Sequence, residues 1–307
     1  MAARAPRRGT VYARSGPTWT LAKTISAPTS AWLGWDIALA DDVLAIGSGF
    51  FDCYNYYQWS EATVHVHERD ASGPGAWGRV STISDGNYIG GSFGKSVSLA
   101  GGLLVVAEHA DLYFCGSEPW PLHLYARDLG GPSAWGRLAV LQPPPGMPSG
   151  SSYGRALQMS GSLILANDNS DVHVLDRNAG GPNAWSEQTV FSSLGPFAIE
   201  ASRLYLNVFV TPNWRLEVRD RHLGGENAWG LAGELVASDG APLGNALVTT
   251  DGRVATTAWN AEAVYVFESP HHRSGPRAGL PARPPAGATR SGATRRPRGP
   301  AHRGVPR

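Results

Sequence analysis

Three histidines at one position of a repeated segment are the first candidates for chemistry. His65, His123 and His173 each lie between two apolar residues of an alternating stretch. Imidazole is a common zinc ligand, but every ligand must approach the ion to about 2 Å. Equivalent positions of consecutive repeats are normally too far apart for that. His67 and His109 are isolated and carry no ligand spacing. We therefore expect packing or solvent exposure for these side chains and predict no metal site.

Two serines lie in matches to the pattern G-x-S-x-G, at Ser92 and Ser152. A hydrolase nucleophile in that pattern needs a strand before the serine and a helix after it. Both serines here fall in a loop that enters a strand, so we interpret the matches as chance in a chain rich in Gly and Ser. No paired-carboxylate motif, phosphate-binding loop or Cys–His zinc pattern is evident. We predict a protein that is not an enzyme, with no catalytic residues.

Two cysteines occupy corresponding loops of consecutive repeats. Cys53 lies 19 residues after Gly34, and Cys115 lies 21 residues after Gly94. Both fall between the second and third strands of their repeats, so the loops should be neighbours on one rim. Either a disulfide between Cys53 and Cys115 or two free thiols fits this pattern. Closing a loop of roughly 60 residues would contribute about 4 kcal/mol through chain entropy.

The same two loops are rich in aromatic residues. Phe51 to Trp59 reads F-D-C-Y-N-Y-Y-Q-W, and Leu112 to Trp120 reads L-Y-F-C-G-S-E-P-W. Exposed amphipathic rings on a rigid scaffold recognise both proteins and sugars. The alternative is that these rings fold back over the rim and cover sheet edges. The predicted ligand-binding residues are Tyr54, Tyr56, Tyr57, Trp59, Tyr113, Phe114 and Trp120.

A nine-residue turn motif organises the elements that position these loops. It reads R-D-A-S-G-P-G-A-W from Arg69, and near-copies begin at Arg127, Arg177 and Arg221. An alternating apolar segment precedes each copy, and the final Trp opens another short strand. The Asp or Asn accepts a backbone N–H, and the Gly allows positive φ. We expect a hairpin between the last two strands of each unit, with the Trp packed against a neighbouring sheet.

A second motif supplies the first two strands of each unit. It reads F-G-K-S-V-S-L-A-G-G-L-L-V-V-A from Phe93, and versions start at Leu33, Tyr153, Leu194 and Leu243. The glycines of the five copies are separated by 60, 60, 41 and 49 residues. Four-stranded units repeated at this spacing are typical of a β-propeller. The predicted fold class is all-β, a propeller of about five four-stranded blades.

These motifs together resemble bacterial FG-GAP repeat proteins, which are related to integrin α-chain propellers. The resemblance spans roughly residues 9–268 and rests on F-G-x-S-V-x-L, L-V-V-A, V-x-V-x-x-R-D and G-G-P-x-A-W. It implies a secreted or cell-surface protein with a role in protein binding or cell adhesion. The G-A-P that names the family is degraded here, to I-G-S at Ile46, V-A-E at Val106 and L-A-N at Leu165.

The calcium-binding D-x-D-x-D-G loop of integrin-type repeats is absent. The nearest stretch is N-D-N-S-D, in which Asp168 and Asp171 could contribute oxygen ligands. A solvated loop is the favoured interpretation, so we predict no cofactor and keep calcium as the alternative.

The two ends of the chain differ from the repeats. We expect residues 1–8 to be disordered, 9–268 to form the propeller and 269–307 to form a disordered tail rich in Arg, Pro and Gly. The tail is interpreted as either a basic surface-binding arm or the product of out-of-frame translation. A shortened version of the repeat's second half occurs near the start of the chain, as T-V-Y-A-R from Thr10 and G-P-T-W-T-L-A-K-T-I from Gly16. The strand of Trp19 is therefore expected to complete the blade formed by Leu243 to Phe267.

Charge and hydropathy limit the possible partners. Nine of the 26 basic residues and no acidic residue follow Glu268, which leaves 17 basic against 25 acidic residues in 1–268. An acidic body argues against nucleic-acid binding. No apolar run approaches the roughly 20 residues that span a bilayer. The start lacks the apolar stretch of a secretory signal, which by itself favours the cytoplasm, whereas the resemblance implies an extracellular location.

We therefore predict a monomeric, non-enzymatic recognition or adhesion module that binds a protein or glycan through its rim loops. A glycan-active propeller enzyme is the first alternative, and it would need carboxylates that converge on one face. A truncated fragment of a larger propeller, without independent function, is the second.

Overall fold

The computed structural model describes residues 8–26, 33–50, 60–84, 93–108, 120–148, 151–168, 170–210, 213–250, 252–258, 263–268 and 289–290. Strands and turns account for the regular structure of these residues, and they include no apolar helix of membrane-spanning length.

Five four-stranded antiparallel sheets follow one another along the chain. The first contains β3 (Leu33–Ala40), β4 (Val43–Phe50), β5 (Ser60–Glu68) and β6 (Gly78–Ile83). The second contains β7 (Phe93–Ala100), β8 (Leu103–Glu108), β9 (Leu122–Ala126) and β10 (Gly136–Leu141). The third contains β11 (Leu157–Ser160), β12 (Leu163–Asn167), β13 (Asp171–Asp176) and β14 (Ser186–Ser192).

The fourth sheet contains β15 (Phe197–Glu200), β16 (Arg203–Val210), β17 (Asn213–Asp220) and β18 (Gly230–Leu235). The fifth contains β19 (Leu243–Thr250), β20 (Arg253–Ala258), β21 (Val264–Glu268) and the short β22 (Thr289–Arg290). A separate two-stranded sheet, β1 (Arg8–Ser15) with β2 (Thr18–Ser26), precedes them all. The five repeated units of the sequence are therefore five sheets.

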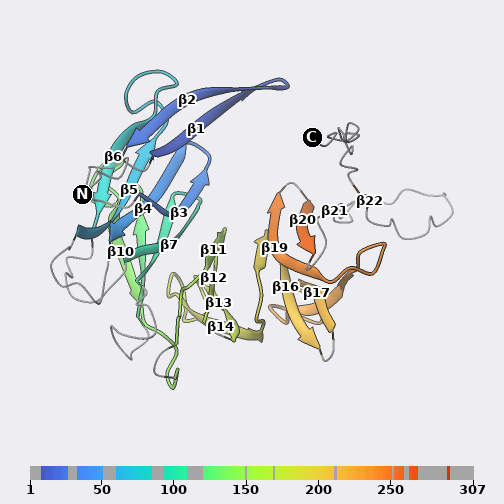
Figure 1. Cartoon of the computed structure of the whole chain (residues 1–307). Helices are drawn as coiled ribbons and strands as arrows, with labels where there is room; N and C mark the ends of the chain where they lie inside the picture. The colour runs from blue at the N-terminus through green and yellow to red at the C-terminus, as the bar shows by residue number, and fades with distance from the viewer. Residues whose placement is uncertain are drawn as a thin grey trace, which may run out of the picture.

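The sheets are arranged in chain order along an arc, with the first strand of each sheet on the inside (Figure 1). Side chains of these inner strands bind the backbone of the next one. Asp36 Oδ2 on β3 accepts the N–H of Val97 on β7 at 2.8 Å. Gln158 Oε1 on β11 accepts the N–H of Ile199 on β15 at 2.9 Å. This is a propeller-like arrangement of blades around a common axis.

Hydrophobic cores fill the spaces between successive sheets, and the second strand of each of the first four sheets contributes to two core clusters. On β8, Leu104 and Val106 face the core shared with the first sheet. Val105 and Ala107 face the core shared with the third sheet. A strand covered on both faces needs apolar residues at every position, not only at alternate ones. The continuous run L-L-V-V-A is explained by this double burial.

The glycine of the F-G motif allows two neighbouring sheets to approach closely. Gly94, the second residue of β7, has a φ of 81°, in the left-handed region that favours glycine. A Cβ at this position would lie 2.8 Å from Val64 Cγ2 of the first sheet. Gly154 of the third sheet is placed in the same way, because its Cβ would lie 2.9 Å from Ala107 Cβ of the second. The motif therefore reflects packing between sheets.

The predicted hairpins are confirmed in four sheets. The motif that begins at Arg127 joins β9 to β10, and Asp128 Oδ1 accepts the backbone N–H of Ser133 at 3.0 Å, as expected for that position. Trp135 is 2% exposed and packs in the core between the first and second sheets. Trp229 is 1% exposed and packs between the third and fourth. The prediction that the motif's Trp packs against a neighbouring sheet is confirmed at these positions.

The prediction that the strand of Trp19 completes the last sheet is wrong. β1 and β2 pair with each other through a tight turn at Gly16, and they lie beside the first sheet (Figure 1). Ile25 of β2 packs on Trp77 of the first sheet, much as Ile83 of that sheet packs with Trp135 of the second. The β1–β2 hairpin thus takes the place of the outer half of a preceding sheet.

The expected disorder of both ends lies largely outside the described residues. Of the first eight residues only Arg8 is described, at the start of β1. Of the tail, Thr289 and Arg290 pair with Val266 and Tyr265 of β21, and so the fourth strand of the last sheet comes from the tail.

Candidate functional site

The loops predicted to bind a ligand begin and end on one rim. The loop after β4 returns to β5 in the first sheet, and the loop after β8 returns to β9 in the adjacent second sheet. Because both connect second strands to third strands, they leave equivalent edges of neighbouring sheets. Trp120 is half-buried, and its indole Nε1 is buried with no hydrogen-bond partner among the described residues.

The other predicted residues of these loops lie outside the described part of the chain, and they stay predictions. They are Tyr54, Tyr56, Tyr57, Trp59, Tyr113 and Phe114. The same holds for the proposed disulfide between Cys53 and Cys115.

The repeated histidines are packed side chains with partners inside their own sheets. His123 Nε2 lies 3.2 Å from Glu108 Oε2, and His173 Nδ1 lies 2.6 Å from Glu187 Oε2. His65 lies 3.4 Å from the hydroxyl oxygens of both Thr63 and Thr82.

All three histidines are at most 7% exposed, so the expectation of packing is confirmed. The described residues contain no group of three or more His, Cys, Asp or Glu that could hold a metal ion. Sequence reasoning missed the partners of these histidines, although Glu108 and Asp168, which lie 3.2 Å from His123 and 3.7 Å from His173, share one repeat position at the end of the second strand.

The two aspartates considered for calcium close a turn. Asp168 Oδ1 accepts the backbone N–H groups of Ser170 and Asp171, each at 2.7 Å. The carboxylate of Asp171 accepts the hydroxyls of Ser170 at 3.0 Å and of Ser192 at 2.9 Å. Both carboxylates thus hold the connection from β12 to β13 and its neighbour β14 in place.

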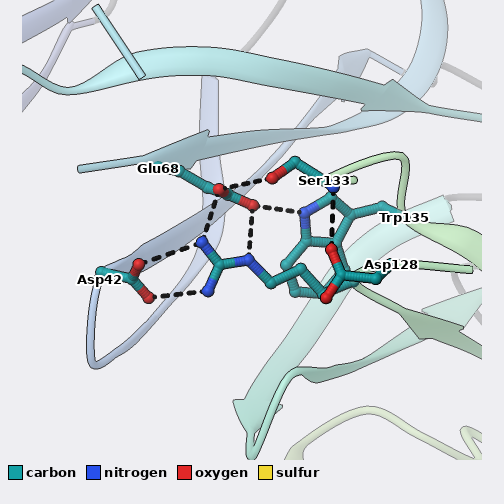
Figure 2. A network of polar contacts seen from close by, with 6 residues as sticks. Asp42, Glu68, Asp128, Ser133 and Trp135 are labelled. Carbon is teal, nitrogen blue, oxygen red and sulfur yellow. Dashed lines mark hydrogen bonds and ion pairs between the residues drawn. The ribbon is translucent and has the colours of Figure 1, made fainter. Parts of the chain in front are cut away.

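A polar network around Arg127 joins the first and second sheets (Figure 2). The guanidinium donates to both oxygens of Glu68, at 3.0 and 2.6 Å, and to both oxygens of Asp42, at 3.1 and 3.0 Å. Ser133 Oγ and Trp135 Nε1 also donate to Glu68, at 2.8 and 3.0 Å. Arg127, Ser133 and Trp135 belong to the turn motif of the second sheet, whereas both carboxylates belong to the first.

The charges in this network are mutually stabilised. Burial alone would raise the pKa of Glu68, but the hydrogen bonds from Arg127, Ser133 and Trp135 lower it below its usual value. The hydrogen bond from Arg127 likewise lowers the pKa of Asp42, against the opposing effect of desolvation. The two carboxylates raise the pKa of Arg127 further. All three groups are ionised at neutral pH.

The Arg127 network follows a rule that can be read from the repeats. Arg127 binds Glu68, the last residue of β5 in the preceding sheet, and Arg221 binds Asp176, the last residue of β13 in its preceding sheet. Between the second and third sheets, the position equivalent to Glu68 and Asp176 is occupied by Ala126. Arg177 accordingly forms no ion pair among the described residues. These ion pairs connect neighbouring sheets, and the arginines are already paired with carboxylates.

No protein-family model and no curated protein matches the chain. Among solved structures, the chain is similar to Hsv2 of Kluyvelomyces marxianus, with a TM-score of 0.48 and 8% sequence identity. The similarity covers 76% of this chain and 60% of Hsv2. The repeated sheets and the hydrophobic cores between them define the propeller-like fold, independently of that similarity.

Proposed function

We propose that this protein is a non-enzymatic recognition module that binds a protein or glycan ligand through the loops 51–59 and 112–120. The observation that carries the proposal is the common rim from which both loops leave, on two adjacent sheets. The seven predicted aromatic residues belong to these two loops, among them Tyr56, Tyr57 and Trp59. Large amphipathic rings are the residues that most often supply the binding energy of such surfaces.

The scaffold beneath the loops supports this function. The Arg127 network and the core around Trp135 hold the first and second sheets against each other. Loops that leave two firmly coupled sheets present their rings with less loss of conformational entropy on binding. The proposal includes an FG-GAP-like propeller of five blades, for which the five successive four-stranded sheets are the support.

Replacing Tyr56, Tyr57 and Trp59 together by Ala is expected to weaken ligand binding at least about tenfold, because each ring removed from a contact centre typically costs 1 kcal/mol or more. A glycan array and a panel of surface proteins identify the ligand, and calorimetry then measures the affinities. The matched control replaces Tyr12 and Trp19, which are 53% and 64% exposed on the β1–β2 hairpin. Unchanged affinity in the loop variant, or an equal loss in the control, would contradict the proposed site.

A further inference from the structure

A cavity of about 430 Å³ lies between the β1–β2 hairpin and the outer half of the first sheet. The functional side chains that line it come from three strands and one turn. Lys23 belongs to β2, His65 and His67 to β5, Arg79 to β6, and Trp77 to the turn before β6. We call this space the basic cavity. Its size is in the range of pockets that hold small molecules.

The fixed charges around the basic cavity are all positive. Lys23 and Arg79 carry full charges at neutral pH, and none of the described residues that line the cavity is acidic. Among the described residues, neither of these two cations forms an ion pair. This differs from Arg127, Arg215, Arg219 and Arg221, whose guanidinium groups all contact carboxylates. The basic cavity therefore holds positive charge that the described part of the chain leaves unbalanced.

A buried histidine without a partner lines the same cavity. His67 is 7% exposed, and its Nδ1 atom is buried with no hydrogen-bond partner among the described residues. It is the cross-strand neighbour of Arg79. A buried polar atom without a partner is unfavourable, and a ligand that supplies the hydrogen bond removes that penalty.

The surroundings of His67 make the pKa of its imidazole sensitive to a bound anion. Burial, followed by the charges of His65, Arg79 and Lys23, lowers the pKa of His67 to about 4. Burial and Arg79 also lower the pKa of His65. An anion bound beside His65 and His67 would raise the pKa of both side chains, because a negative charge favours the protonated imidazole.

We propose that the basic cavity binds a small ligand through a sulfate or phosphate group. The Arg79 guanidinium presents paired N–H donors that match such an oxyanion, and Lys23 adds a second full charge. His67 lines the cavity as a further donor, and Trp77 forms an apolar wall. The site is separate from the rim loops. β2 and β6 carry neither loop, and on β5 the lining residues His65 and His67 lie five and seven residues beyond Ser60, where the loop 51–59 enters the strand. The group can belong to the free inorganic ion or to an ester of a sugar.

Calorimetric titration with sodium sulfate and sodium phosphate, at constant ionic strength against sodium chloride, tests the proposal. We expect saturable binding of at least one oxyanion, and at least about tenfold weaker binding in Lys23→Gln and Arg79→Gln. Arg137→Gln is the matched control, because Arg137 occupies the position of Arg79 in the second sheet, is exposed as Arg79 is, and does not line the basic cavity. It should bind as the wild type does. Absence of binding above chloride, or an equal loss in Arg137→Gln, overturns the proposal.

The pH dependence gives a second readout that general charge attraction does not produce. Because the pKa of His67 is about 4 before binding and rises on binding, the protein should take up protons and bind more tightly as the pH falls from 7.5 to 5.5. His67→Gln should bind with a reduced pH dependence and a reduced proton uptake. The groups that face His67 are His65, Arg79 and Lys23. Proton uptake that is unchanged in His67→Gln would exclude this histidine from the site.

The source of the oxyanion is found with galactose 6-sulfate as a third probe. Tighter binding of the ester than of free sulfate assigns the site to a sulfated sugar, and equal or weaker binding of the ester assigns it to the free ion. Melting temperatures measured in sodium chloride verify that each variant is folded. The loop variant with Tyr56, Tyr57 and Trp59 replaced should keep this binding, which separates the basic cavity from the proposed rim site.

Discussion

Arg127→Met is expected to lower the free energy of unfolding by about 3 kcal/mol, because it removes one partner of a buried ion pair. Glu68 is only 5% exposed, and in the variant it keeps only the hydrogen bonds from Ser133 and Trp135. A carboxylate left in that position must pay its desolvation cost without a compensating charge. Urea denaturation at pH 7, followed by tryptophan fluorescence, measures the difference.

The matched control is Arg177→Met, at the same position of the next turn motif. The residue that corresponds to Glu68 in the preceding sheet is Ala126, which has no charge to pair with Arg177. We therefore expect the free energy of unfolding to change by no more than about 0.5 kcal/mol. A second Glu68→Gln change should recover part of the loss from Arg127→Met, since the buried charge is gone. Equal effects of the two arginine variants would mean that the Arg127 network contributes nothing specific.

Acid should reduce the difference between wild type and Arg127→Met. In the wild type the pKa of Glu68 is lowered, so its contribution is complete above the ordinary value and is lost as the pH falls through the lowered one. Without Arg127 and its hydrogen bonds, burial raises the pKa of Glu68. The carboxylate of the variant is therefore protonated at a higher pH than in the wild type, and its protonation removes the destabilising buried charge. A difference between the two proteins that grows between pH 7 and pH 4 would contradict this account.

Gly94→Ala is expected to cost about 3 kcal/mol, from two separate effects. The φ of 81° at Gly94 costs an L-residue about 1 to 2 kcal/mol. The new Cβ would lie 2.8 Å from Val64 Cγ2 and 3.2 Å from the backbone oxygen of Thr63, and relief of such overpacking typically costs another 1 to 3 kcal/mol. The first and second sheets would have to move apart. Thermal and urea unfolding measure the loss.

Gly34→Ala separates these two effects. Gly34 occupies the same motif position in the first sheet with a φ of 88°, but no described atom lies within 4 Å of its Cβ position. We therefore expect only the backbone term, about 1 to 2 kcal/mol. If Gly94→Ala is no more destabilising than Gly34→Ala, close approach of the two sheets is not the reason for the glycine.

Much of the fold could be predicted because its repeats carry local signals. The positive φ at Gly131 and the side chain of Asp128 act within a few residues of their own position, so the hairpins follow from the motif itself. The placement of β1 and β2 could not be predicted in this way. The turn at Gly16 pairs these strands at a separation of only a few residues, whereas pairing with the last sheet requires closure of a loop of more than 200 residues, which costs more conformational entropy.

The candidate sites were predictable to different degrees. Aromatic density identifies the rim loops, because composition is visible without coordinates. The Arg127 network is visible only after the repeats are aligned, when Glu68 and Ala126 are compared at one position. His67 carried no spacing signal at all. Its importance depends on the distance to Lys23 and Arg79, which come from other strands.

The sequence by itself therefore determined the repeated unit, its hairpins and the aromatic loops, because each depends on contacts between residues close in the chain. Only the tertiary structure decided which charges are neutralised. Arg127 meets two carboxylates, and Arg79 meets a cavity with Lys23 and a buried histidine. Both arginines belong to copies of one repeat: Arg127 begins a copy of the turn motif, and Arg79 lies two residues after the end of another copy. What surrounds each of them is set by the neighbouring sheet or hairpin, through packing between segments distant in the chain.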